Sequence, residues 1–316
     1  MTIQQMKYIL TIVRTGSFNK ASEILYISQP ALTNSVKDLE SELGVRLFVR
    51  NGKGARLTPE GEEFCGYARQ LCQQYEYITE HYAGTGNKKT RFSVSAQHYS
   101  FVSAALVRLI AEKNLSRYDI TLRETRTKVV IADVRNQYSD IGILYLSDFN
   151  RSAITKLLKN NGLEFHKLLS CPVCVFLHKN HPLADRAQIS FAELKPYPCL
   201  VFDQGEDSSF YYAEEVLTTA EYDRIIHVSD TSSMKTMLAA MDGYVLCSGL
   251  CEDKKKQGEF LTIPYLADET NPGGVMEIGY ITKNGMVLGE LCRAFLALVR
   301  EELHLPPEDP DTGITW

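Results

Sequence analysis

The sequence predicts an α/β chain made of a helix-turn-helix head with a wing, a linker helix and an α/β body. Short amphipathic helices with capping residues fill residues 1–43. Apolar residues at heptad spacing follow over residues 59–82, which is typical of one long helix. From residue 90 strand patterns alternate with helical ones, and this alternation predicts parallel α/β layers.

Charge is unevenly distributed along the chain. The formal net charge of −5 by itself argues against a nucleic-acid partner. Residues 1–58, however, hold eight Lys or Arg against four Asp or Glu, whereas residues 59–83 hold one against five. A small basic head therefore precedes an acidic remainder.

The chain shows neither a signal-peptide pattern nor an apolar run long enough to span a membrane. We therefore expect a cytoplasmic protein that does not contact a membrane. Its eight cysteines are scattered through apolar segments. In a cytosolic chain of this length they are expected to be reduced and mostly buried.

Capping residues predict three short helices in the head. Thr2 opens a capping-box pattern, and Gly16 is placed to end the helix that follows. Ser17 can cap a second helix and Ser28 a third.

The third helix carries an unusual outer face. Four leucine or valine residues recur at helical spacing and must face the core: Leu32, Val36, Leu39 and Leu43. This leaves polar, non-acidic side chains outside: Gln29, Thr33, Asn34 and Lys37. Asn and Gln can pair with adenine, and Thr can contact a thymine methyl, so this face fits the major groove of double-stranded DNA. Spacing alone leaves a solvated helix in a small bundle as an alternative.

A Gly-rich hairpin is expected directly after these helices. The segment "RLFVRNGKGARL" places basic residues around its tip: Arg46, Arg50, Lys53 and Arg56. Cations at such a wing would contact phosphates, which supply affinity, whereas the helix would supply sequence choice. The first domain is thus expected over residues 1–58.

A linker helix and hinge are expected over residues 59–89. Pro59 can start the helix, and its apolar residues step by four and three as a dimerisation seam: Phe64, Ala68, Leu71, Tyr75, Ile78 and Tyr82. Since the seam is short, a helix that packs on its own domain is the alternative. The segment "GTGNKK", 84–89, would be a flexible link.

The head resembles the winged helix-turn-helix of LysR-type transcriptional regulators. The resemblance rests on "ASEIL" and "SQPAL" in the second and third helices, then on "LESELGVRLFVR" and the closing "LTPEG", and it covers residues 1–61. It implies that Pro30 and Ala31 also lie at the DNA. One departure is that Thr33-Asn34 stands where the family usually has Ser-Arg or Thr-Arg, which puts that arginine contact in doubt here.

The resemblance extends to the body through "SDIGIL", "HPLA" and "DTSSMKTMLAAMDGYVLCS". It implies two α/β subdomains like those of a periplasmic binding protein, with a small effector between them. We expect this effector domain over residues 90–303, with subdomain I at 90–162 and 268–303 and subdomain II at 163–267. The crossings would lie near Leu163 and Pro264, and residues 304–316 would be a tail. Within subdomain II, "SFYYAEEVLTTA", 209–220, is expected to form a helix.

Loops after strands and at helix starts are the candidates for effector binding. The candidates are Ser95, Gln97, His98, Tyr99, Ser100, Thr125, Arg126, Phe202, Asp203, Thr231 and Ser232. Hydroxyls, helix N–H groups and Arg126 suit an anionic metabolite. Asp203 and His98 argue against a purely anionic site, so an effector that also carries an amine or hydroxyl stays open. Each residue could instead merely cap a helix.

The remaining motifs do not predict a cofactor, a metal site or an enzyme. Cys171 and Cys174 form a C-x-x-C without further ligands, and no nucleophile-elbow pattern occurs. Cys247 and Cys251 could form a redox pair, so a redox-sensing or solute-binding protein on this scaffold is the alternative. The expected partners are double-stranded DNA, a small effector and a second copy of the chain in a homodimer or homotetramer. RNA polymerase is a further candidate.

Overall fold

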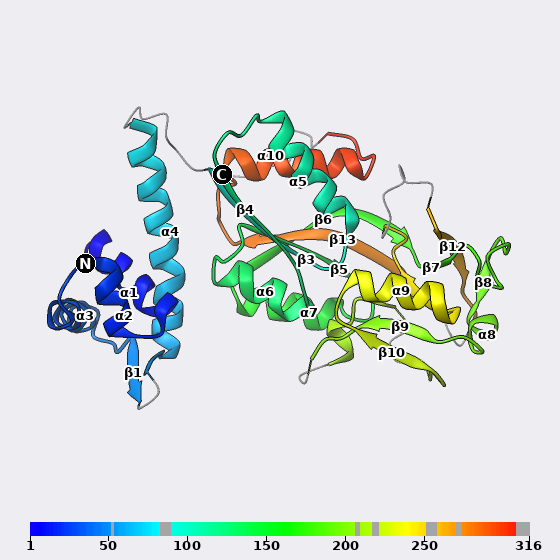
Figure 1. The fold of residues 1–316 in the computed structure, drawn as a ribbon, viewed down its shortest axis with the longest axis horizontal. Coiled ribbons are helices and arrows are strands. Elements are labelled where there is room, and N and C mark those ends of the chain that lie inside the picture. The colour runs from blue at the N-terminus through cyan, green and yellow to red at the C-terminus, as the bar shows by residue number, and fades with distance from the viewer. Residues whose placement is uncertain are drawn as a thin grey trace. The chain divides into compact units, whose positions relative to one another are not determined.

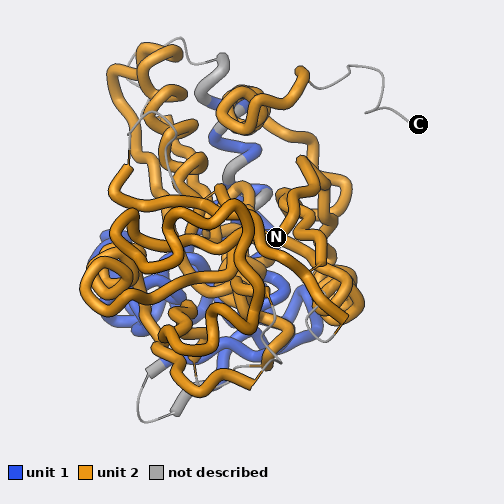
Figure 2. Tube along the Cα trace, turned by 90° about the vertical axis from the view of Figure 1, so that its right-hand side faces the viewer, with its two compact units in different colours: residues 1–89 blue, residues 90–316 orange. Residues whose placement is uncertain are grey.

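The computed structural model describes residues 1–51, 54–82, 90–205, 209–216, 221–250, 258–269 and 274–307, except for the side chains of residues 50, 51, 54, 70, 73, 77 and 80–82. Contacts divide the chain into two compact units, Met1–Lys89 and Thr90–Trp316 (Figure 2). Lys53, Cys251, the link at 84–89 and tail residues 308–316 lie outside the described residues. No helix in the described ranges is long and apolar enough to cross a membrane.

The first unit begins with three helices, α1 (Ile3–Thr15), α2 (Phe18–Leu25) and α3 (Gln29–Leu43) (Figure 1). The predicted caps are present. Thr2 forms a capping box, and the side chains of Ser17 and Ser28 accept hydrogen bonds from backbone N–H groups in the first turns of α2 and α3. Gly16 ends α1 at a φ of 65°, a left-handed conformation that glycine adopts at little cost.

A two-stranded hairpin completes the head. Strand β1 (Phe48–Asn51) pairs antiparallel with β2 (Gly54–Leu57), and Phe48 lies opposite Leu57. The core beneath the helices and the hairpin consists of fully buried apolar side chains: Ile9, Ile12, Leu32, Leu39 and Leu47. Helix α4 (Pro59–Tyr82) follows the hairpin.

The second unit contains two sheets, of which the first has the strand order β4-β3-β5-β13-β6. These strands are β3 (Thr90–Ala96), β4 (Tyr118–Glu124), β5 (Ile141–Leu146), β6 (Leu163–Pro172) and β13 (Val275–Lys283). Strand β3 runs parallel to β4 and β5, whereas β13 runs antiparallel to β5 and β6.

Helices cover both faces of this first sheet (Figure 1). Helices α5 (Ser100–Glu112) and α10 (Glu290–Glu302) share one buried cluster with residues of β3, β5 and β13. Helices α6 (Thr127–Arg135) and α7 (Arg151–Asn160) belong to a second cluster on the same sheet. The strands of a sheet covered on both faces are almost wholly apolar, as the completely buried β5 shows.

The second sheet has the strand order β10-β9-β11-β7-β12-β8. Its strands are β7 (Cys174–His178), β8 (Ile189–Ser190), β9 (Cys199–Phe202), β10 (Ile225–Val228), β11 (Tyr244–Cys247) and β12 (Phe260–Leu266). Helix α9 (Thr231–Met241) packs on this sheet through Met234 and Leu238, and the short α8 (Phe191–Leu194) follows β8.

The chain crosses between the sheets later than the expected boundary at Leu163. Strand β6 pairs with β13 along its whole length, from Leu163 opposite Lys283 to Pro172 opposite Val275, so it belongs to the first sheet. The first crossing therefore lies at Val173, between β6 and β7. The second lies between Leu266 and Val275, which includes the expected subdomain boundary at 267/268 but follows Pro264, a residue of β12.

The helix expected over residues 209–220 is also wrong for its described part. Only a short 3₁₀ turn, η1 (Phe210–Tyr212), forms there. Residues Ala213–Val216, which follow it, have no helical structure. The side chains of Glu214 and Glu215 turn inward instead, toward hydrogen-bond partners in other elements.

Candidate DNA-binding face and effector pocket

Helix α3 presents the predicted face. Leu32, Val36 and Leu39 are buried beneath it. On the other side Pro30, Ala31, Asn34 and Lys37 are exposed, while Gln29 and Thr33 are half-buried. The Gln29 amide donates a hydrogen bond to Thr33 Oγ1 at 2.7 Å, which orients this amide along the helix surface. The helix therefore offers donors and acceptors at the surface on a rigid backbone.

The wing adds cations to the same unit. Arg46 is 79% exposed and Arg56 is exposed as well. The side chain of Arg50 lies outside the described residues, as does Lys53. Arg46 also approaches Glu40, with Nη1 lying 3.5 Å from Oε2, so one predicted phosphate contact has an internal partner.

Glu40 of α3 joins the wing to the helix through side-chain hydrogen bonds. It was not among the residues predicted from the sequence. One of its oxygens accepts hydrogen bonds from the backbone N–H groups of Leu47 at 2.7 Å and Phe48 at 3.1 Å. The side chain is 8% exposed. These bonds satisfy two backbone donors at the start of β1, which would otherwise be buried without partners.

Helix α4 has two apolar faces rather than one seam. Of the predicted seam, Ala68 is buried against α1 and Phe64 packs on the head core. The alternative of a helix packed on its own domain thus holds for this first part. Leu71, Tyr75 and Ile78 are 45–55% exposed. Tyr67, which was not predicted, is 53% exposed, and the side chain of Tyr82 lies outside the described residues.

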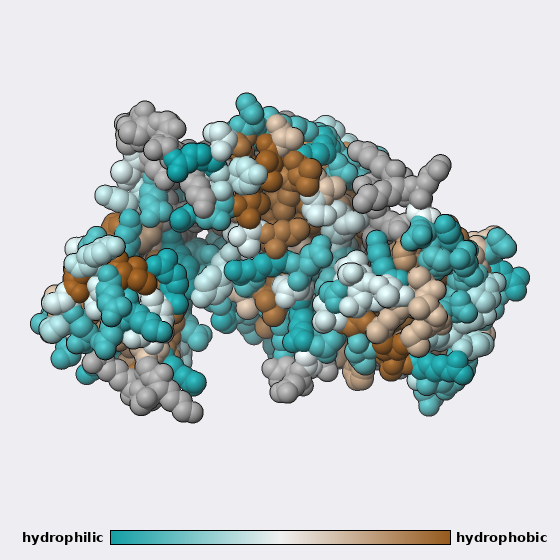
Figure 3. All heavy atoms as spheres, viewed as in Figure 1, coloured by the Kyte–Doolittle hydropathy of each residue, from teal (hydrophilic) through white to brown (hydrophobic). Residues whose placement is uncertain are grey.

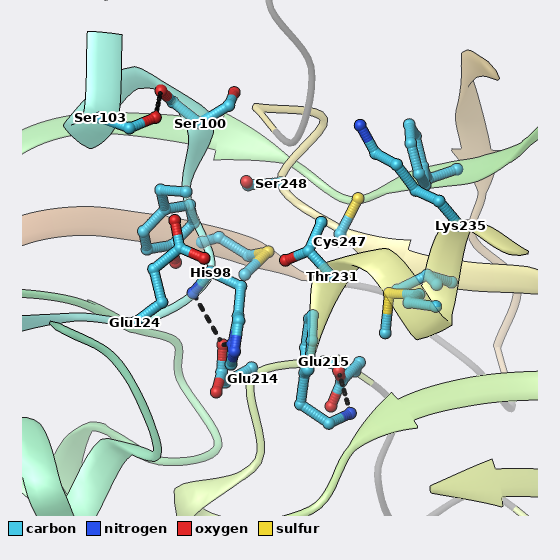
Figure 4. A pocket seen from close by; sticks show the side chains of 16 residues that line it. His98, Ser100, Ser103, Glu124, Glu214, Glu215, Thr231, Lys235, Cys247 and Ser248 are labelled. Carbon is cyan, nitrogen blue, oxygen red and sulfur yellow. Dashed lines mark hydrogen bonds and ion pairs between the residues drawn. The ribbon is translucent and has the colours of Figure 1, made fainter. Parts of the chain in front are cut away.

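A pocket of about 220 Å³ lies in the second unit, with walls from both sheets (Figure 4). The loop after β3 and the start of α5 contribute His98, Tyr99, Ser100 and Ser103. The rest of the lining comes from Glu124, Phe176, Phe202, Glu214, Glu215, Thr231, Met234, Lys235, Val245, Cys247, Ser248 and Met276.

The pocket includes five of the predicted effector residues: His98, Tyr99, Ser100, Phe202 and Thr231. The other predicted residues do not line it. Ser95 is buried and donates to Asp133 Oδ2 at 2.6 Å. Gln97 is buried, and its side-chain amide nitrogen donates to Thr127 Oγ1 at 2.7 Å. The oxygen of the same side-chain amide accepts from the Tyr145 N–H at 3.0 Å. These two polar side chains hold secondary-structure elements together, which periodicity could not reveal.

Arg126 and Asp203 form an ion pair with each other instead of lining the pocket. Arg126 Nε donates to the Asp203 carbonyl at 3.0 Å, and its Nη2 donates to the Asp203 carboxylate. The Gly205 N–H, which donates to Asp203 at 3.0 Å, and the Arg126 guanidinium lower the pKa of this carboxyl below its ordinary value. This pair joins the loop between β4 and α6 to the segment after β9. Thr125 and Ser232 likewise lie outside the lining.

Glu214 and Glu215 are two of the eleven lining residues, out of sixteen, that were not predicted from the sequence. Glu214 Oε2 accepts from the His98 backbone N–H at 3.1 Å and lies 2.9 Å from His98 Nδ1. The His98 ring stacks on the Phe202 ring, with centroids 3.6 Å apart and planes inclined by 4°. Glu215 Oε1 accepts from the Phe202 N–H at 2.8 Å. The adjacent acids in "YAEEV" were the available signal, but residues 209–220 were expected to form a helix, and neither acid was assigned to a site.

The expected anionic effector does not match this lining. That expectation rested on hydroxyls, helix N–H groups and Arg126, and the one cation among them, Arg126, is engaged with Asp203 outside the pocket. Three carboxylates line the pocket, those of Glu124, Glu214 and Glu215, against the single lysine Lys235 and His98.

Two cysteines near the pocket, Cys171 and Cys174, are poor candidates for redox chemistry. Cys174 of β7 lies opposite Cys247 of β11, and Cys171 is the last but one residue of β6. The pair of Cys247 and Cys251 stays a prediction, because Cys251 lies outside the described residues. Burial raises the pKa of the Cys171 thiol to about 12 and that of Cys174 to about 11. Since the thiolate is the reactive species, these thiols are unreactive at neutral pH.

Known families match both units of the chain. A model described as "Bacterial regulatory helix-turn-helix protein, lysR family" matches residues 3–62, and one described as "LysR substrate binding domain" matches residues 93–304. The chain belongs to the LysR family. LysR-type proteins are DNA-binding transcription regulators with a separate effector-binding domain, and this domain is the second unit described above.

Curated relatives of this LysR-type chain are distant. The uncharacterized HTH-type transcriptional regulator YvbU of Bacillus subtilis is 28% identical over 66% of this chain and 69% of its own length. A probable nitrogen assimilation transcriptional activator of Synechocystis is 28% identical to this chain. The matched region covers 65% of this chain and 64% of that relative. YbhD of Escherichia coli, also an uncharacterized regulator, is 24% identical over 98% of this chain and 93% of its own.

Solved structures share the fold. A full-length OxyR variant from Pseudomonas aeruginosa has a TM-score of 0.66 at 21% identity and covers 95% of both chains. Full-length CbnR in complex with its target DNA has a TM-score of 0.54 at 16% identity, over 96% of this chain and 100% of CbnR.

Proposed function

We propose that this LysR-type regulator reads operator DNA with α3 and responds to a small effector in the pocket between its two sheets. The observation that supports this most directly is the α3 face. Asn34 and Lys37 are exposed beside the half-buried Gln29 and Thr33, while the leucines of the same helix are buried. A helix of this kind reads base edges when it enters the major groove.

Phosphate contacts would come from the wing and base contacts from the helix. Arg56 projects from β2 into solvent, and Arg46 lies at the start of the hairpin. Arginines at a wing contribute sequence-independent affinity that falls with salt, since each phosphate contact releases counterions. We assign Gln29, Pro30, Ala31, Thr33, Asn34 and Lys37 to the groove, and Arg46, Arg50, Lys53 and Arg56 to the phosphates. With DNA as its partner, the protein would act in the cytoplasm.

The effector would act through a difference in affinity between two arrangements of the protein. The pocket takes its walls from both sheets, and the chain crosses between the sheets at Val173 and again between Leu266 and Val275. A ligand that contacts both walls favours one relative position of the sheets over another. Only this difference in binding free energy can shift the population of DNA-binding states.

The replacement Asn34→Ala will reduce discrimination between the operator and a variant base sequence. Loss of a paired contact to a base costs about 1–3 kcal/mol of discrimination. Fluorescence anisotropy with the DNA upstream of the chain's own gene, against the same DNA with single-base changes, measures this difference. Unaltered discrimination in this variant would remove Asn34 from base readout.

Arg56→Ala is the matched control for Asn34→Ala. Because Arg56 is assigned to a phosphate, its loss should weaken binding to every sequence alike and reduce the salt slope by about one unit. If the wild-type chain does not prefer its upstream DNA over unrelated DNA at any salt concentration, the proposed function is wrong as a whole.

We further propose that α4 pairs two copies of the chain, which would present two α3 helices to successive major grooves. The exposed apolar residues Tyr67, Leu71, Tyr75 and Ile78 recur at helical spacing. Figure 3 also shows an apolar patch on the second unit over the region of α5, where Val107 is 67% exposed. Such a patch suits a second contact between copies, as a tetramer requires.

The replacement Leu71→Glu will dissociate this dimer. A carboxylate placed in an apolar interface loses its hydration, and the dissociation constant should rise at least tenfold, or about 1.4 kcal/mol. Sedimentation equilibrium of the full chain measures the change. Thr79→Glu is the control, because Thr79 is also exposed on α4 but continues the face of Ala68 and Cys72. Equal association of both variants would mean that α4 is not the interface.

A further inference from the structure

We propose that the effector carries a protonated amine, and that this ammonium group binds the free carboxylate oxygen of Glu215. The inference depends on the proposed function, because it names the ligand class of the same pocket. The assignment of the ligand class depends first on one oxygen atom of Glu215. Glu215 is 3% exposed and lines the pocket, and its Oε2 has no hydrogen-bond partner among the described residues.

An unpartnered oxygen of this kind needs an explanation, because buried polar groups in folded proteins nearly always have partners. The other oxygen, Oε1, is fixed by the Phe202 N–H at 2.8 Å. The carboxyl group is therefore held in one orientation, with its second oxygen available to a ligand. Once the carboxyl group is ionised this oxygen can only accept, so a group that donates hydrogen bonds, and whose positive charge favours the ionised form, is its complement.

The charges around Glu215 select a cationic donor over a neutral one. Glu214 is the adjacent residue, and Glu124 also lines the pocket (Figure 4). Glu214 already accepts from His98, and from Gln204 Nε2 at 3.2 Å, so it is held in place as a fixed negative charge. An ammonium group beside these carboxylates gains from all of them, whereas an anion would be repelled.

The bases of the pocket do not offset these acids. Lys235 of α9 lies over the Phe260 ring, with Nζ 5.6 Å from its centre, and Phe260 is not part of the lining. His98 is engaged with Glu214 and stacks on Phe202. Lys235 and His98 therefore both have protein partners, and the three acidic side chains outnumber them.

The remaining lining residues and the pocket volume indicate the polarity and size of the rest of the ligand. Phe176, Met234, Val245 and Met276 contribute apolar side chains to the lining. At about 220 Å³ the pocket is smaller than the sites of about 300 Å³ and more that hold drug-sized molecules. A small amine with a short apolar chain or ring fits both observations.

Binding of such an amine should release a proton. Burial, and the neighbouring Glu214, raise the pKa of Glu215 well above its ordinary value, so the empty pocket favours the neutral form of this group. Also facing it are His98, Glu124, the Cys247 thiol and the Tyr145 hydroxyl, which donates to the Glu215 carbonyl at 3.2 Å. When the ammonium binds, the acid becomes a carboxylate and its proton passes to solvent.

Compounds that share one carbon chain test the ligand class. The melting temperature of the full chain is measured with n-butylamine, n-butanol and butyrate as probes, each titrated to saturation. We expect n-butylamine to raise it, and the other two to have little effect. The class is wrong if butyrate or n-butanol stabilises the chain as much, or if the amine does not stabilise it.

The variant Glu215→Gln localises the effect. Its amide oxygen can still accept from the Phe202 N–H, but the negative charge is lost, so n-butylamine should bind at least tenfold more weakly. Glu221→Gln, at an exposed glutamate of the same unit, should bind it as the wild type does. Undiminished binding to Glu215→Gln would overturn the assignment.

Calorimetry of the wild-type chain provides a readout that does not depend on the folding of a variant. Titration of n-butylamine in phosphate and in MOPS, whose ionisation enthalpies differ and neither of which is a primary amine, should show the release of up to one proton. Binding without proton release contradicts the role of Glu215. Operator binding by the empty chain is measured separately, so failure of the amine class is distinguishable from failure of DNA recognition.

Discussion

Replacement of Glu40 with alanine will lower the free energy of unfolding of the first unit by about 2–4 kcal/mol. The carboxylate accepts from the backbone N–H groups of Leu47 and Phe48, at 2.7 and 3.1 Å. Alanine leaves both donors without this acceptor. A buried donor without a partner costs about 1–3 kcal/mol. Two such donors account for the expected loss in the free energy of unfolding. Calorimetric melting of the full chain measures it.

The same change should weaken DNA binding, because β1 begins at Phe48 and loses its attachment to α3. Glu40→Gln keeps one acceptor oxygen and should lose less stability than Glu40→Ala. Glu42→Ala is the matched control. Glu42 lies two residues further along α3, with an exposed side chain paired with the N-terminal ammonium, and surface pairs are worth about 0–1 kcal/mol. If Glu40→Ala melts like Glu42→Ala, the wing is held by other contacts.

Glu40 shows which part of the head the sequence could predict. The buried set of Leu32, Val36 and Leu39 was predictable, because apolar spacing and the Ser28 cap depend only on residues close in the chain. A glutamate on the same helix is normally assigned to solvent. Its burial is a consequence of where β1 begins, and that depends on the tertiary arrangement of the head.

Pairing between distant strands limited the prediction for the second unit in the same way. The strand character of residues 163–172 is visible in the sequence, but its partner β13 lies more than a hundred residues away. Because hydrogen bonding to β13 is non-local, the boundary between the sheets could not be placed at Val173 from local patterns. The predicted effector loops were partly right, since His98 and Thr231 follow strands of the two sheets and line the pocket.

The segment that contains Glu214 and Glu215 was misassigned for a related reason. Its composition fits an amphipathic helix, but the carboxylates find partners on other elements, at His98 and at the Phe202 N–H. These tertiary hydrogen bonds replace helical structure after η1. The acids that give the pocket its charge were therefore invisible to a reading of periodicity.

The variant Glu215→Gln will be more stable than the wild-type chain without a ligand, and the difference will grow as the pH rises. Unfolded glutamate titrates near pH 4.3, whereas burial and Glu214 raise the pKa of Glu215 well above its ordinary value. Below both pKa values the folded and unfolded states each bind the proton, and this group contributes nothing. Between them the folded state keeps a proton that the unfolded state has released.

In that window the unfolded state binds fewer protons, so stability falls with rising pH, by at most about 1.4 kcal/mol per pH unit. Glutamine does not titrate, so Glu215→Gln removes this loss of stability with rising pH. We expect no larger pH-dependent effect from a single substitution in the second unit. Melting temperatures of the empty chain at about pH 5 and about pH 8 measure the difference. Glu221→Gln should follow the wild type at both values. A difference between Glu215→Gln and the wild type that stays constant with pH would show that Glu215 is already ionised in the folded pocket, and the expected proton release on amine binding would then fail with it.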